Sequence, residues 1–280
     1  MCEESLEFVE ISSNDMDDYV LIDGEFQSSL GGAVTLWLTV PKQRDKKLPA
    51  IIFMHPGQGN RNSFLEEGKL LASKGVISLM MDAPFARTSN PKSQNPGIGE
   101  IVENVVDIET YKQTIADTKR SISLLTSLEY VDSERILYVG HSFGATWGGV
   151  LAGMEERICG FLLMAGFSSL SEWHRNSQHP LAELVRSYLT HERFIHFCNQ
   201  IALMDAKHFI KNAAPAEVYF QFARDDDFVP LEQAETYYES SSFPKKISWY
   251  QTDHLFSTCE EATADRMAWY IEKLKLDELR

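Results

Sequence analysis

Hydrophobic and polar positions alternate in two different ways along the chain. In the first 45 or so residues, two short apolar runs at 6–11 and 33–40 flank a polar, glycine-containing stretch, which is typical of an antiparallel start. After Pro49, apolar runs of strand length alternate with longer helical segments, which predicts a mostly parallel sheet with helices on both faces. The expected strands are 50–54, 76–81, 135–140, 158–165, 216–223 and 246–251.

Three segments between or after these runs have helical signals. Ser63 is followed three residues later by Glu66, a capping-box pattern that predicts a helix over 63–74. Apolar residues at alternating steps of three and four predict a helix over 105–128 whose apolar side faces the sheet. Residues 260–276 repeat this pattern and are expected to form the closing helix.

Residues 168–212 interrupt the alternation. They contain no strand pattern but many aromatic and histidine side chains. A long helical insertion after a core strand favours a cap over the end of the sheet, with extra surface helices as the simpler alternative. Its aromatic residues hint at an apolar portion of a ligand. We therefore expect one domain over 1–280 with a helical cap insertion at about 168–212.

Composition narrows the possible partners. A chain of 280 residues with 44% hydrophobic content can bury one large core. Its formal net charge of −15 disfavours nucleic acid and anionic membrane surfaces. The most apolar run, 158–167, is about half of a membrane span, and the acidic start does not resemble a secretion signal. We expect a cytoplasmic protein with no nucleic-acid or membrane partner.

Cysteine and histidine spacing argues against a metal site. The cysteines at 2, 159, 198 and 259 form neither a paired zinc pattern nor a disulfide framework, so reduced thiols are expected. In the insertion, His191 and His196 are five residues apart, which does not align them on one helical face as ligands. No cofactor or metal is expected.

The sharpest chemical signal follows the apolar run 135–139, which leads directly into Gly140-His141-Ser142-Phe143-Gly144. A strand that reverses into a helix while holding a strained serine needs almost no side chain two positions before and after it. Gly140 and Gly144 meet that need, although an ordinary turn could show the same letters. We interpret the segment as a nucleophile elbow with Ser142 as nucleophile.

A serine hydroxyl needs a base to take its proton and an acid to orient that base. Strand 216–223 ends in an acidic run containing Asp225, Asp226 and Asp227, where a carboxylate can point into the crevice at the strand ends. His254 follows the last expected strand and precedes the closing helix. It is therefore the candidate base, with a structural or surface role as the alternative, and the residues alone leave the aspartate open.

Charge that develops on a substrate carbonyl needs preorganised donors. The backbone amide of Phe143 follows the nucleophile directly. A second amide is expected from the loop His55-Pro56-Gly57-Gln58-Gly59 after strand 50–54. Since Pro56 has no amide and the glycines permit close approach, Gln58 is the better candidate.

Together these features resemble the α/β-hydrolase superfamily, in particular its branch related to dienelactone hydrolases and the catalytic domains of prolyl oligopeptidases. The resemblance covers nearly everything from Leu48 onward and includes the turn 81–84 and the approach 131–136 to the elbow strand. It implies the α/β-hydrolase fold. The acid turn of that fold places Asp three residues before a Val-Pro pair, which selects Asp226, with Asp225 next.

Two departures from these relatives shape the functional expectation. Dienelactone hydrolases use cysteine where this chain has Ser142, and prolyl oligopeptidases carry a large propeller that about 45 residues cannot supply. We expect a compact serine esterase that acts on a small-molecule ester through an acyl enzyme on Ser142. A thioesterase, an amidase or peptidase, an acyltransferase, or a catalytically silent binding member of the fold remains an alternative.

Two arginines are a weaker hint about the substrate. Arg61 and Arg87 lie on loops expected near the crevice. They could meet an anionic group of a substrate or be ordinary surface residues.

Overall fold

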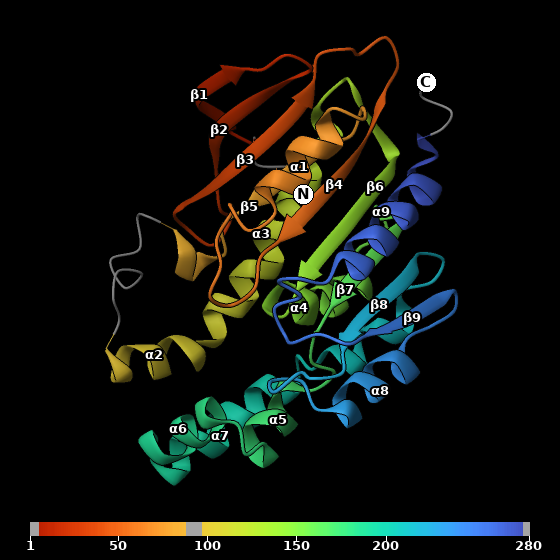
Figure 1. Cartoon of the computed structure of the whole chain (residues 1–280). Helices are drawn as coiled ribbons and strands as arrows, with labels where there is room; N and C mark the ends of the chain where they lie inside the picture. The colour runs from red at the N-terminus through yellow and green to blue at the C-terminus, as the bar shows by residue number, and fades with distance from the viewer. Residues whose placement is uncertain (1–5, 88–96, 277–280) are drawn as a thin grey trace.

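A computed structural model describes residues 6–87 and 97–276, which form one twisted sheet with helices around it (Figure 1). The strand order across the sheet is β1-β2-β3-β5-β4-β6-β7-β8-β9. The strands are β1 (Val9–Asp15), β2 (Tyr19–Gln27), β3 (Ala33–Pro41), β4 (Leu48–Met54), β5 (Ile77–Met81), β6 (Val131–His141), β7 (Gly160–Met164), β8 (Glu217–Ala223) and β9 (Lys245–Tyr250).

The sheet has an antiparallel and a parallel part. The pairs β1–β2, β2–β3 and β3–β5 are antiparallel, whereas β5, β4, β6, β7, β8 and β9 pair in parallel. Every residue of β4, β5 and β7 is buried, because helices cover both faces of these strands. The predicted mostly parallel sheet with an antiparallel start is confirmed.

Strand β2 was not predicted, because the polar, glycine-containing stretch that forms it was expected to be a connection between two strands. Its Asp23 has a partner outside the strand, since the carboxylate accepts a hydrogen bond from Arg61 at 2.5 Å. Gly24 allows close packing, because a Cβ there would approach the Phe8 ring to 2.6 Å. Asp23 and Gly24 locally favour a loop, but contacts with residues distant in sequence stabilise them in a strand.

Two helix predictions need correction. Helix α1 (Leu65–Ala72) has Phe64 at its N-cap position without a side-chain cap, and Ser63 instead accepts a hydrogen bond from the Asn60 amide at 3.3 Å, so the capping-box interpretation is wrong. Helix α3 (Ile108–Ser127) begins later than expected because the Asp107 side chain caps it. The residues before that cap form a separate helix, α2 (Ile98–Val105).

The helices lie on both faces of the sheet. On one face, α1 and α9 (Glu260–Leu274) are joined because Arg266 and Tyr270 both bond to Glu67 at 2.9 Å. On the other, α3 packs against α4 (Phe143–Ala152), and Tyr237 of α8 (Leu231–Ser240) donates to the Ala145 carbonyl of α4 at 2.8 Å. Figure 1 shows α1 and α9 in front of the central strands.

The segment 168–212 is helical. It contains α5 (Leu170–Asn176), α6 (Pro180–Tyr188), α7 (His191–Ala202) and the short turns η3 (Ala206–His208) and η4 (Ile210–Asn212). Helices α5, α6 and α7 gather beyond the end of the sheet toward which the β4 and β6 arrows point (Figure 1). Asp205, which lies between α7 and η3, accepts hydrogen bonds from the hydroxyls of Ser169 and Ser171 at the start of α5, each at 2.6 Å.

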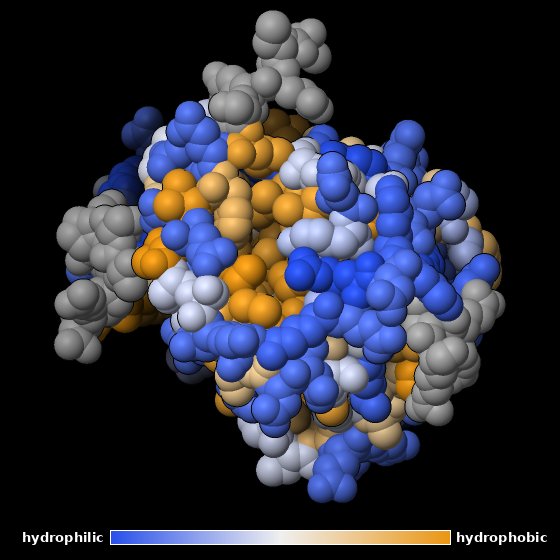
Figure 2. Space-filling view, turned by 90° about the horizontal axis from the view of Figure 1, so that it is seen from above, coloured by the Kyte–Doolittle hydropathy of each residue, from blue (hydrophilic) through white to orange (hydrophobic). Residues whose placement is uncertain are grey.

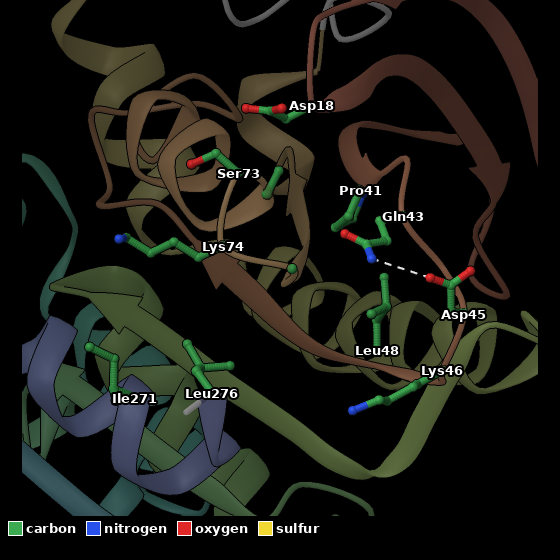
Figure 3. Close-up of a pocket in the computed structure, with 12 residues that line it drawn as sticks. Asp18, Pro41, Gln43, Asp45, Lys46, Leu48, Ser73, Lys74, Ile271 and Leu276 are labelled. Carbon is green, nitrogen blue, oxygen red and sulfur yellow. Dashed lines mark hydrogen bonds between the residues drawn. The ribbon is translucent and has the colours of Figure 1, made fainter. Parts of the chain in front are cut away.

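A hollow lies at the opposite end of the sheet, between the start of β4 and the last turns of α1 and α9. Its apolar lining includes Leu48, Ile271 and Leu276, and charged side chains such as Lys46 and Lys74 surround it (Figure 3). Figure 2 views this end and shows hydrophobic side chains within a hydrophilic rim. The hollow is remote from the carboxyl ends of the parallel strands, where the candidate site residues lie.

Candidate active site

Ser142 stands at a sharp reversal between β6 and α4. Its backbone has φ 50° and ψ −104°, a region that a residue with a side chain rarely adopts. The Ser142 amide donates to the Met164 carbonyl of β7 at 2.7 Å, which helps to hold this conformation. The strand-to-helix reversal expected from the motif is therefore present.

The two glycines of the motif are required by close backbone packing. A Cβ on Gly140 would clash with the backbone of Gly144, and a Cβ on Gly144 would clash with the Met54 carbonyl of β4. Any larger residue would have to displace main chain rather than a flexible side chain. The glycines thus let the elbow fit against the central strands.

The three predicted triad residues meet at this elbow. His254, in the loop after β9, has Nε2 at 2.8 Å from Ser142 Oγ. Its Nδ1 lies 2.8 Å and 2.9 Å from the two carboxylate oxygens of Asp226, in the loop after β8. The side chains of His254 and Asp226 are only 8% and 2% exposed. Hydroxyl, imidazole and carboxylate thus form a continuous hydrogen-bonded line.

Asp225 and Asp226, which are adjacent in the acidic run, lie in different environments. Asp226 Oδ1 also accepts the amides of Phe228 and Val229, both at 2.8 Å, which fixes the carboxylate toward His254. Asp225 is exposed, and its carboxylate instead accepts from Gln251 Nε2 at 2.5 Å. Asp226 therefore occupies the position that the resemblance selected.

His141 is a site neighbour to which the sequence analysis gave no role. Its Nε2–H donates to the His254 carbonyl at 2.7 Å. Burial, together with a smaller contribution from the proximity of His254, lowers the pKa of His141 to about 4. His141 is consequently neutral near pH 7 and supports the backbone of the loop that carries His254.

Phe228 is a second neighbour that sequence reasoning missed. Its ring stacks on the His254 imidazole, with centroids 4.8 Å apart and an interplanar angle of 30°. Only its position two residues after Asp226 could have indicated this contact.

The loop after β4 lies beside the elbow, as the oxyanion prediction requires. The Gly59 amide bonds to the Pro56 carbonyl at 2.9 Å, so Gly57 and Gln58 occupy the centre of a turn. A Cβ on Gly57 would lie 3.9 Å from that of Phe143. The Phe143 amide is among those that a helix leaves unbonded at its first turn.

Buried His55 anchors this loop. Its Nδ1–H donates to the Pro56 carbonyl at 2.7 Å, and its Nε2 accepts the Ala83 amide at 3.0 Å. Burial lowers the pKa of His55, which suits this neutral donor–acceptor role.

Neither arginine singled out from the sequence is an ordinary surface residue. Arg61 bonds to Asp23 at 2.5 Å and stacks over Trp37, with 4.4 Å from its guanidinium carbon to the ring centroid. Arg87 is buried and paired with Asp117. Both side chains therefore form ion pairs within the fold, near the loops expected at the crevice.

The remaining sequence expectations concern thiols, metals and membranes. Cys159, Cys198 and Cys259 are free thiols, and Cys2 lies outside the described residues. Within 6–87 and 97–276, no three His, Cys, Asp or Glu side chains gather in a metal-binding group. In the same ranges, every helix is too short or too polar to cross a bilayer.

Comparison with solved structures gives the same architecture. An acetyl xylan esterase from a Thermoanaerobacterium species matches with a TM-score of 0.77 at 19% identity, covering 97% of this chain and 89% of that one. One from a Paenibacillus species gives 0.76 at 19% identity, covering 97% and 90%. A 2,6-dihydroxy-pseudo-oxynicotine hydrolase gives 0.68 at 20%, covering 90% and 67%. At these identities the likeness shows the α/β-hydrolase fold.

Sequence comparison identifies the family. No curated protein matches the chain. Residues 2–273 match the family described as acetyl xylan esterase (AXE1), which spans nearly the whole sequence. The expectation of an ester-cleaving serine hydrolase is thereby confirmed, and the chain belongs to the acetyl xylan esterase (AXE1) family.

Proposed function

We propose that Ser142, His254 and Asp226 are the catalytic triad of this esterase. The observation that carries the proposal is the line of contacts from Ser142 Oγ to His254 Nε2 at 2.8 Å and from His254 Nδ1 to Asp226 at 2.8 Å. Neutral His254 takes the Ser142 proton while Oγ attacks the ester carbonyl, and Asp226 stabilises the imidazolium. The alcohol leaves with the proton from Nε2, and water, activated by the same base, releases the acid.

The amides of Phe143 and Gln58 are the proposed oxyanion donors. The turn at 56–59 and the start of α4 support this assignment because the loop lies against Phe143. Preorganised donors of this kind act on charge that develops in the transition state, and each is worth about 3 to 4 kcal/mol.

We further propose that the substrate is an acetyl ester of a small molecule. The family description supports the acetyl group, as do the names of two similar structures. A cluster of aromatic rings around Phe143, the residue after the nucleophile, supports a short acyl chain, since the Phe143 ring lies 5.0 Å from Phe85 and 6.1 Å from Trp147. Moving large, well-packed rings to admit a longer acyl chain is energetically costly.

Residues 168–212 are proposed to cap this site within a single domain. Their helices lie beyond the carboxyl ends of the strands (Figure 1), where open α/β sheets bind ligands. The insertion also meets the acid loop directly, since Trp173 donates to the Phe228 carbonyl at 2.7 Å. A substrate at Ser142 would therefore lie between the sheet and these helices.

Covalent labelling tests the triad. A fluorophosphonate probe should modify wild-type protein at Ser142, as mapped by peptide mass spectrometry, and Ser142→Ala should not be labelled. In the same variant, acetyl ester hydrolysis should fall by a factor of about a million, because the nucleophile is gone. Circular dichroism confirms folding of both proteins. An adduct at another residue, or none on folded wild type, refutes the proposal.

A further inference from the structure

Phe228 lies between the helical insertion and the candidate triad. It is in the loop between β8 and α8, two residues after Asp226, and its side chain is half-buried. Its backbone and its ring each contact both sides.

On the triad side, Phe228 contacts both the acid and the base. Its amide donates to Asp226 Oδ1 at 2.8 Å. Its ring stacks on the imidazole of His254 at 4.8 Å between centroids. One residue thus fixes the direction of the carboxylate and limits the tilt of the imidazole that the carboxylate orients.

On the insertion side, two residues hold Phe228. The indole Nε1–H of Trp173, in α5, donates to the Phe228 carbonyl at 2.7 Å. The ring of His179 lies 4.0 Å from the Phe228 ring between centroids, so the Phe228 ring contacts the imidazoles of both His179 and His254. His179 is itself fixed, because its Nδ1 accepts the Leu181 amide at 3.1 Å as the cap of α6.

We propose that Trp173 is a positioning residue that acts on His254 through Phe228, so that the insertion holds the catalytic base in line with Ser142. The inference rests on the proposed triad. A catalytic group must be held close to its productive geometry, and a displacement of about 1 Å can cost a hundredfold in rate. The aromatic face of Phe228 can also stabilise the imidazolium that forms when His254 takes the proton.

A matched pair of tryptophans separates positioning from general packing. Trp173 and Trp269 are 4% and 3% exposed, but the Trp269 indole nitrogen has no hydrogen-bond partner among the described residues. Trp269 packs in α9 against Tyr219, away from the acid loop. Trp173→Phe therefore removes a buried indole and its bond to Phe228, whereas Trp269→Phe removes a comparable indole alone.

The test measures kcat and KM for an acetyl ester, the rate of fluorophosphonate labelling and the melting temperature of each variant. We expect Trp173→Phe to lower kcat and the labelling rate about tenfold while KM changes less than about twofold. Trp269→Phe should keep the wild-type kcat. Phe228→Leu should lose at least as much kcat as Trp173→Phe, and Phe228→Tyr, which keeps the aromatic face, should restore most of it.

A double variant shows whether Trp173 acts through Phe228. If it acts through the Phe228 ring, which Phe228→Leu removes while the carbonyl bonded to Trp173 stays, adding Trp173→Phe to Phe228→Leu should lower kcat no further than Phe228→Leu alone. Fully multiplicative losses, or equal kcat losses in Trp173→Phe and Trp269→Phe, overturn the inference. If wild-type Ser142 is labelled but Trp173→Phe is labelled at the wild-type rate, this inference alone fails. If wild-type Ser142 is not labelled, the proposed triad fails first.

Discussion

Buried His174 should make the insertion sensitive to acid. The side chain is 1% exposed in α5, with ring centroids 4.9 Å from Trp173 and 5.1 Å from Phe197. Its Nδ1 has no hydrogen-bond partner in the described part of the chain. Burial, together with a smaller contribution from the positive charge of Arg186, lowers the pKa of His174 to about 3. The perturbation is His174→Leu, which puts an apolar side chain of similar size in its place and removes the titration.

The magnitude follows from the pKa difference between the folded and unfolded states. Above pH 6.5, the ordinary histidine pKa, His174 is neutral in both states and contributes no pH dependence. Below pH 6.5 the unfolded chain binds a proton that the folded chain excludes, so the free energy of unfolding falls until about pH 3. At about 1.4 kcal/mol per pH unit, lowering the pH to 4.5 costs wild type about 2.7 kcal/mol through this residue.

Urea unfolding followed by tryptophan fluorescence, at pH 7.0 and 4.5, measures this loss. Between the two values, His174→Leu should lose about 2.7 kcal/mol less unfolding free energy than wild type. His141, whose folded pKa is about 4, titrates in the same window but is present in both proteins, so it cancels. Exposed His196, on α7, supplies the control, because His196→Leu should lose as much as wild type. Equal losses in wild type and His174→Leu would refute the reasoning.

Two further predictions concern the chemistry. Asp226→Asn should lower kcat/KM for p-nitrophenyl acetate about 10³- to 10⁴-fold, because a neutral amide cannot stabilise the imidazolium. Asp225→Asn should stay within about twofold of wild type, since that carboxylate bonds to Gln251 instead. The reverse ranking in initial-rate assays would contradict the assignment. Across a series of p-nitrophenyl esters, kcat/KM should fall at least about tenfold from acetate to hexanoate, because the ring of Phe143, the residue after the nucleophile, is packed against Phe85. A flat series would contradict a short acyl site.

The elements that carry the site were predictable because their causes are local or nearly so. The reversal at Ser142 needs glycine on both sides for steric reasons that five consecutive residues reveal, and the clashes at Gly140 and Gly144 show that need in the structure. Parallel strands bring their carboxyl ends to one edge of a sheet. If the apolar runs are such strands, the loops that hold Asp226 and His254 must meet Ser142 at that edge, and the pairing of the strands has this order.

Strand β2 and the acid within the aspartate run depended on partners distant in sequence. Asp23 is compatible with a strand because Arg61 lies 38 residues later and reaches it. The turn of the loop points the side chains of Asp225 and Asp226 in different directions. The amides of Phe228 and Val229 fix the direction of the Asp226 carboxylate. The residues alone did not distinguish these carboxylates; the acid turn of the related fold did.

The insertion shows the same limit for side-chain contacts. Its aromatic density hinted at an apolar ligand, yet Trp173 and His179 both contact Phe228 of the acid loop. Trp173 and Phe228 are 55 residues apart, and helical periodicity indicates which side of a helix is buried without specifying what covers it. An aromatic residue that contacts a catalytic loop and one that contacts substrate have the same local pattern. The insertion can therefore hold His254 in place with residues whose spacing gives no sign of that contact.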